Sequence, residues 1–163
     1  MRRITTIATA LVLMLALSTS AAFAAHDIVN GTAAGEVIKG TAATDTIHGL
    51  DGNDAIYGMG GDDTLYGDAG RDGLYGGPGA DIIRGGAGDD RAEERKVFGG
   101  SGNDTLYGDA GSDALYAGPG SDKIFSVGDG TGDTVNCGSG IDTVKKGSDQ
   151  NLDTFVNCER FVS

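Results

Sequence analysis

Large apolar residues occur singly and at intervals of nine positions along most of this chain, with one five-residue interruption. They are Ile38, Ile47, Ile56, Leu65, Leu74, Ile83, Val97, Leu106, Leu115 and Ile124. Because side chains alternate between the two faces of a strand, each apolar residue would point inward and its two neighbours outward. One such residue per unit cannot form a core alone, but stacked units can. The pattern therefore predicts an all-β solenoid of very short strands.

A glycine-rich segment with one aspartate precedes each apolar residue. In units numbered so that the aspartate is position 6 and the apolar residue position 8, glycine recurs at positions 1 and 4. We expect these glycines to take positive φ, to turn the chain tightly and to point carbonyl oxygens at a common centre. The glycines concerned are Gly49, Gly52, Gly58, Gly61, Gly67, Gly70, Gly76, Gly79, Gly85, Gly88, Gly99, Gly102, Gly108, Gly111 and Gly120. The aspartates are Asp45, Asp54, Asp63, Asp72, Asp81, Asp90, Asp104, Asp113 and Asp122.

Carboxylates stacked at fixed intervals need a cation between them. Calcium accepts carboxylate and backbone carbonyl oxygens in flexible geometry, whereas magnesium demands strict octahedra. Zinc and copper prefer histidine and cysteine, of which the chain has two each. The sequence therefore predicts several Ca²⁺ ions, held by these aspartates and glycine carbonyls. A flexible Gly/Asp linker is the alternative.

The frame resembles the nonapeptide of the RTX (hemolysin-type) calcium-binding repeats, as in the unit that runs from Gly99 to Tyr107. The resemblance implies a parallel β-roll, a right-handed β-solenoid in which two units make one coil and calcium lies in the turns. It places each aspartate over the one two units later, and the predicted pairs are Asp45/Asp63, Asp54/Asp72, Asp63/Asp81, Asp72/Asp90 and Asp104/Asp122. Asp81/Asp104 and Asp90/Asp113 would span the interruption. Asp62 and Asp89, at position 5, are expected to face solvent. Folding should be coupled to calcium binding.

Residues 1–24 carry Arg2 and Arg3, an apolar run and the sequence Ala22-Phe23-Ala24, which is typical of a secretory signal peptide; an uncleaved anchor is the alternative. We expect a secreted, extracellular protein with no membrane span in the mature chain. Removing two of 12 basic residues leaves 10 against 24 acidic ones, a formal net charge of −14. Such a charge argues against nucleic-acid binding and favours divalent cations.

The chain divides into segments of different regularity. Residues 25–48 are degenerate opening repeats, in which Glu36 replaces the first aspartate, and residues 49–125 form the regular roll. Residues 91–95 are a five-residue insertion, either a simple loop or a partner-binding protrusion. Residues 126–163 hold divergent repeats and a C-terminal cap, similar to the ends of small stand-alone bacterial calcium-binding repeat proteins.

Two cysteines, Cys137 and Cys158, lie in this last segment. In an exported protein an even pair favours a disulfide over free thiols or a metal pair, and the bond would lock the cap and protect the last strand edge.

All five tyrosines occupy position 9, on the outward side of the strand. By parity they should form two columns, Tyr57, Tyr75, Phe98 and Tyr116 on one sheet and His48, Tyr66, Arg84, Tyr107 and Phe125 on the other. Cross-strand stabilisation is one interpretation. The other is a surface adhesin or matrix protein whose aromatic strip binds glycan or an envelope protein. A third possibility is a detached module of an RTX hydrolase or toxin. No HExxH or GxSxG motif is present, so we expect no enzymatic activity.

Overall fold

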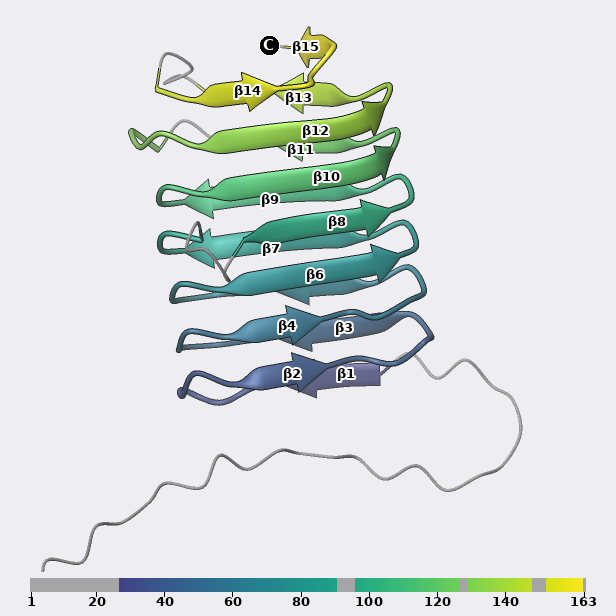
Figure 1. Ribbon diagram of the computed structural model, residues 1–163. Helices are drawn as coiled ribbons and strands as arrows, with labels where there is room; N and C mark the ends of the chain where they lie inside the picture. Colours follow the sequence, from purple (N-terminus) through teal and green to yellow (C-terminus); the bar gives the residue numbers. More distant parts are fainter. Residues whose placement is uncertain (1–26, 91–95, 127–128, 148–151, 163) are drawn as a thin grey trace, which may run out of the picture.

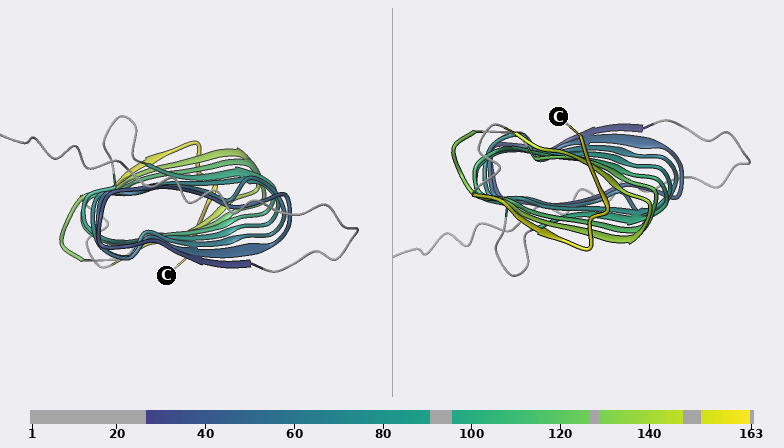
Figure 2. Two further views of the ribbon diagram at one scale, coloured as in Figure 1. Left: turned by 90° about the horizontal axis from the view of Figure 1, so that it is seen from below. Right: turned by 90° about the horizontal axis from the view of Figure 1, so that it is seen from above.

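The computed structural model describes residues 27–90, 96–126, 129–147 and 152–162. Within these ranges the chain winds into a β-solenoid whose coils are stacked along one axis (Figure 1). The odd-numbered strands form an eight-stranded sheet and the even-numbered strands a seven-stranded sheet. Viewed along the axis, the two sheets are the long sides of a flattened oval (Figure 2). The predicted all-β parallel β-roll is confirmed, while the expected signal peptide and the insertion at 91–95 lie outside the described residues.

The strands of the eight-stranded sheet are β1 (Asp27–Asn30), β3 (Asp45–His48), β5 (Thr64–Tyr66), β7 (Ile82–Ala87), β9 (Thr105–Ala110), β11 (Lys123–Phe125), β13 (Thr143–Lys145) and β15 (Arg160–Val162). Those of the seven-stranded sheet are β2 (Val37–Lys39), β4 (Ala55–Tyr57), β6 (Gly73–Pro78), β8 (Val97–Ser101), β10 (Ala114–Gly120), β12 (Thr134–Gly140) and β14 (Thr154–Val156).

The register between strands follows the nine-residue repeat. Ile47 pairs with Leu65, 18 residues later, so that two units make one coil. Across the interruption, Leu74 pairs with Val97, which confirms that Val97 occupies position 8 and that the five inserted residues leave the ladder intact. Towards the C-terminus the offset becomes 20, as between Leu115 and Val135.

The position-8 residues form the core. From Ile47 to Val144 these side chains are fully buried and stack into one interior cluster. Burying a leucine or isoleucine contributes about 1.5–3 kcal/mol. The periodic single apolar residue therefore builds a continuous core only because the coils are stacked.

Positive φ occurs at positions 2 and 4 of the unit. Gly61 and Gly79, both at position 4, have φ of 101° and 150°, and at position 2 even Leu50 and Asp68 lie near +70°. The expectation that position-1 glycines take positive φ was wrong, because Gly49 and its equivalents lie outside that region. Glycine is required at position 1 for a different reason, which concerns the space beside the aspartate.

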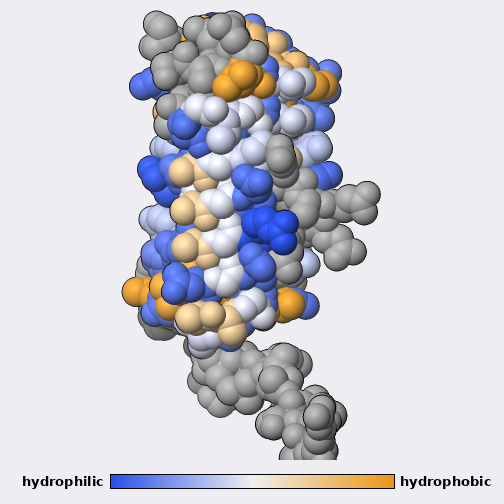
Figure 3. All heavy atoms as spheres, turned by 90° about the vertical axis from the view of Figure 1, so that its left-hand side faces the viewer, coloured by the Kyte–Doolittle hydropathy of each residue, from blue (hydrophilic) through white to orange (hydrophobic). Residues whose placement is uncertain are grey.

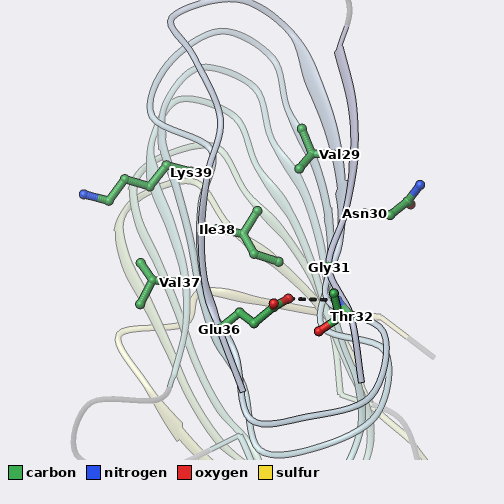
Figure 4. Close-up of a pocket in the computed structure, with 8 residues that line it drawn as sticks. All are labelled: Val29, Asn30, Gly31, Thr32, Glu36, Val37, Ile38 and Lys39. Atoms are coloured by element: carbon green, nitrogen blue, oxygen red, sulfur yellow. Dashed lines mark hydrogen bonds between the residues drawn. The ribbon is translucent and has the colours of Figure 1, made fainter. Parts of the chain in front are cut away.

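The N-terminal coil is more complete than the sequence indicated. Asp27 pairs in register with Asp45, so the first position-6 aspartate is Asp27, and Glu36 follows it one unit later. At this end of the roll Val29 and Ile38 line a pocket together with Glu36, whose carboxylate accepts a hydrogen bond of 2.8 Å from the Thr32 amide (Figure 4).

The predicted disulfide joins Cys137 in β12 to Cys158, between β14 and β15. It ties the last coil to the coil before it. Phe161 and Val162 in the final strand are each 46% exposed, so the bond fastens this coil without covering it.

The two position-9 columns are also confirmed. Tyr75 stacks on Tyr57 at 4.8 Å between ring centroids and on Phe98 at 5.1 Å, with interplanar angles of 8° and 11°. On the other sheet Tyr107 stacks on Phe125, and the Arg84 guanidinium lies 4.2 Å from the centroid of the Tyr107 ring.

Candidate metal sites in the turns

The turns lie along two edges of the roll (Figure 1). The left edge carries the turns that lead from the eight-stranded sheet to the seven-stranded one, and the right edge carries the others. Position-6 acids of the left edge are Glu36, Asp54, Asp72, Asp90, Asp113, Asp133 and Asp153; those of the right edge are Asp45, Asp63, Asp81, Asp104, Asp122 and Asp142, followed by Glu159. Figure 3 views the left edge directly and shows a pale column between hydrophilic side chains.

Hydrogen bonds join each aspartate to the next one along its edge. The amide of Asp45 donates to Oδ1 of Asp63 at 2.8 Å, and the amide of Asp63 donates to Oδ1 of Asp81 at the same distance. The bond persists across the interruption, where the Asp81 amide donates to Asp104 at 2.9 Å. The same contact joins Asp54/Asp72, Asp72/Asp90, Asp90/Asp113 and Asp104/Asp122. Every predicted pair is therefore stacked.

The second carboxylate oxygen is buried and, at most position-6 aspartates (the rungs of the ladder), has no hydrogen-bond partner among the described residues. This holds for Oδ2 of Asp63, Asp81, Asp90, Asp104, Asp113, Asp122 and Asp142. A buried, uncompensated carboxylate oxygen is costly. Its repetition along both edges indicates a ligand that the protein itself does not supply.

The position-1 glycine keeps the space beside that oxygen open. A Cβ atom on Gly85 would lie 2.5 Å from Oδ2 of Asp90 and 2.6 Å from the carbonyl oxygen of Gly108 in the next coil. On Gly99 the corresponding distances, to Asp104 and Ala117, are both 2.5 Å. A side chain would thus separate a carboxylate from a carbonyl that faces it, so the glycine leaves two oxygens directed at one small space.

Burial changes the acidity of these aspartates. It raises the pKa of Asp81 and of Asp90 to about 7, against the opposing effect of the backbone amides of Asp63 and Asp72 and with the help of neighbouring carboxylates. For Asp113 burial, together with Asp90, raises the pKa to about 8. The pKa values of Asp122 and Asp133 rise to about 6 for the same primary reason. The turns thus favour any positive charge, proton or metal, that neutralises these carboxylates.

The donor set fits calcium. Nowhere in the described ranges do three His, Cys, Asp or Glu side chains converge as a metal cluster, so a cation here would need backbone oxygens. Calcium accepts six to eight oxygens and readily uses carbonyls, which the glycine turns offer beside the aspartates. Zinc would lack its nitrogen and sulfur ligands.

Position 5 carries a second ladder that the sequence did not reveal. Asp62 and Asp89 are exposed, as expected. Even so, Asp62 accepts from the Ala80 amide at 2.8 Å, and Asn53 and Asn103 accept from the amides of Arg71 and Ser121 at 2.9 Å. These bonds run in the direction opposite to those at position 6, so adjacent turns are joined both ways.

The ladder also extends beyond the predicted aspartates. The Asp113 amide donates to Asp133, that of Asp122 to Asp142, and that of Asp133 to Asp153. The repeated Asp-Thr before an apolar residue marks these three positions in the sequence. Longer turns move them off the nine-residue spacing, which is why the spacing alone misses them.

A stacked parallel roll of nine-residue units with buried acidic turns defines a class of β-solenoid built for repeated cation sites. The family profile of the RTX calcium-binding nonapeptide repeat matches the chain four times, over residues 30–65, 39–74, 57–92 and 96–125. These matches cover more than half of the sequence, and the chain belongs to this family. A comparison with curated proteins gives no significant match. Over the part that the structure describes, no helix is long and apolar enough to cross a membrane.

Proposed function

We propose that this protein is a secreted calcium-binding repeat protein whose folding is coupled to the binding of several Ca²⁺ ions between stacked turns. The observation that carries the proposal is the buried, unpartnered Oδ2 of successive aspartates, each facing the space that a position-1 glycine leaves open. When bound, calcium supplies the positive charge that these carboxylates lack.

Three kinds of group in each turn would take part in binding an ion. Position-6 aspartates other than Asp45 would bind through Oδ2 while Oδ1 holds the amide of the preceding coil. At Asp45 the Thr41 amide and hydroxyl donate to Oδ2, so Oδ1 would face the ion. Carbonyl oxygens such as that of Gly67 complete the set, and the position-1 glycines give access.

The ligands would be the aspartates from Asp45 to Asp113 and the turn glycines named from the sequence. The predicted ligand Asp122, and Asp142, follow Ala117 and Cys137 at position 1 instead of a glycine. Extracellular calcium modules bind at about 10⁻⁴–10⁻³ M, and we expect affinities in that range.

The aromatic columns support a structural role better than glycan binding. Neighbouring rings are nearly parallel and about 5 Å apart, so their faces are covered by one another and their edges point outward. A sugar stacks on an exposed ring face, which the middle of the column does not offer. The columns therefore support a calcium-binding module in which aromatic pairs reinforce the sheets.

Adjacent residues provide the test. Asp63 is buried with Oδ2 unpartnered, whereas Asp62 is exposed. Calcium stoichiometry would be measured by calorimetry and β-structure by circular dichroism, for the wild type and the variants Asp63→Asn and Asp62→Asn. We expect Asp63→Asn to lose at least one ion and Asp62→Asn to bind as many as wild type. A wild type that binds no calcium at millimolar concentration, or an equal effect of both variants, would refute the proposal.

A further inference from the structure

Position 1 changes character near the C-terminus. It is glycine in every unit from Gly31 to Gly108, and then Ala117, Ser126, Cys137 and Lys146. In the C-terminal coils a glycine therefore no longer keeps open the space beside the position-6 aspartate, as it does in the coils nearer the N-terminus. Of these replacements, Ser126 is the one whose side chain hydrogen-bonds to position-6 aspartates.

Ser126 lies between two carboxylates of the left edge. Its side chain is buried, and its hydroxyl oxygen is 2.6 Å from Oδ2 of Asp153 and 3.3 Å from Oδ2 of Asp133. Its amide donates to the Lys145 carbonyl, which fixes the backbone at this point. On the rung below, Oδ2 of Asp113 has no hydrogen-bond partner among the described residues. The Ser126 side chain thus brings a hydroxyl hydrogen to a place where the preceding coils have only carboxylate and carbonyl oxygens.

Side-chain hydrogen bonds also join this turn to the one beneath it. The Gly111 amide donates to Asp129, and the Thr131 hydroxyl donates to the Gly111 carbonyl at 2.6 Å. The Ser112 hydroxyl donates to the Gly132 carbonyl. Hydroxyl and carboxylate groups therefore hold these two turns together, and carbonyl oxygens that a cation would need already accept hydrogen bonds.

We infer that the Ser126 hydroxyl occupies the place of a cation between Asp133 and Asp153, so that the cation ladder of the left edge ends at Asp113. This inference rests on the proposed function and specifies where along the left edge the cation sites end. A hydroxyl has one hydrogen and no net charge. The shorter contact, to Oδ2 of Asp153, takes that hydrogen, while the hydroxyl oxygen fills the space beside Asp133. The C-terminal coil would then need no metal on this edge.

The test counts ions in the disulfide-bonded chain, with calcium alone as the probe. For a wild type that binds n ions, Ser126→Gly should bind one more, because it reopens the space beside Asp133. Ser126→Ala should bind n, because its methyl group fills that space, and Ser121→Gly, at an exposed position-5 serine, is the control and should also bind n.

A reciprocal variant decides the question if Ser126→Gly does not fold. A Cβ on Gly108 would meet only Oδ2 of Asp113 closer than 3 Å, at 2.8 Å, and that oxygen can rotate. Gly108→Ser should therefore fold and bind n − 1 ions. The inference is overturned if Ser126→Gly folds and still binds n, if Ser126→Ala loses an ion because the serine is itself a ligand, or if Gly108→Ser keeps all n. A wild type that binds none would instead refute the proposed function.

Discussion

Protons should replace calcium in this fold. The pKa of Asp81, on the right edge, and of Asp90, on the left edge, is about 7 in the folded chain, against 3.8 for an ordinary aspartate. Because burial disfavours the ionised form, the folded state takes up protons more readily than the unfolded state. Without metal, the stability that this proton uptake supplies is fully present below pH 4. It is lost as the pH rises from about 4 through 7.

The magnitude is large enough to decide the outcome. A shift of about three pH units corresponds to about 4 kcal/mol for each carboxyl group. Two such groups on separate edges therefore cost about as much as the 5–15 kcal/mol that stabilises a typical domain. The metal-free roll should be folded near pH 5 and largely unfolded at pH 8, where millimolar calcium should restore it.

Circular dichroism of metal-free protein between pH 5 and 8 would measure this, with and without calcium. Asp90→Asn sharpens the assay, because the amide keeps an oxygen for the Asp72 amide and removes the charge. Metal-free Asp90→Asn should retain β-structure to higher pH than wild type and respond less to calcium, while Asp89→Asn, one residue away and exposed, should not differ. β-Structure that is independent of pH without metal, or that increases towards pH 8, would refute the reasoning.

Three further perturbations test the packing. Ile83→Ala should lower the free energy of unfolding by about 2–5 kcal/mol, since Ile83 is fully buried. Ile82→Ala, at a side chain 44% exposed, should change it by less than about 0.5 kcal/mol. Equal calcium midpoints for the folding of the two variants would contradict this. Tyr75→Ser removes two ring stacks and should cost about 1–3 kcal/mol without changing the number of bound ions, which calorimetry would check. Reduction of Cys137–Cys158 should destabilise the roll by about 3 kcal/mol, seen as a higher calcium midpoint, and an unchanged midpoint would count against a stabilising cap.

The stacking of coils could be predicted because the aspartate and the apolar residue recur with the same nine-residue period. Asp45 and Ile47 recur together, so a slip of one residue would expose the core and bury other side chains. The same parity predicts Tyr57 beside Tyr75, and the two rings stack in the structure. Even the interruption at 91–95 did not hide the register, since Val97 resumes the pattern.

The reasons for individual glycines could not be read from the sequence. A glycine that accommodates positive φ and a glycine that leaves space for a neighbour look the same as letters. From Leu50 to Gly118 position 2 adopts positive φ, and the sequence did not reveal this because Leu50, Met59 and Asp68 occupy it as well as glycine. The hydroxyl of Ser126 could not be placed either, because six residues separate it from Asp133, whereas four separate position 1 from position 6 in the regular units.

Comparison of the hydrogen bonds at positions 5 and 6 shows that the backbone hydrogen bond does not require a negative charge at position 6. At position 5 an amide oxygen is sufficient, since Asn53 and Asn103 accept the same kind of backbone hydrogen bond as Asp62. An asparagine at position 6 could likewise accept the amide of the preceding coil, without the cost of a buried charge. Yet every unit from Asp45 to Asp153 has aspartate there. The hydrogen bond accounts for one oxygen and not for the charge. A divalent cation, as proposed above, would account for the charge, because it can neutralise carboxylates of two successive coils at once.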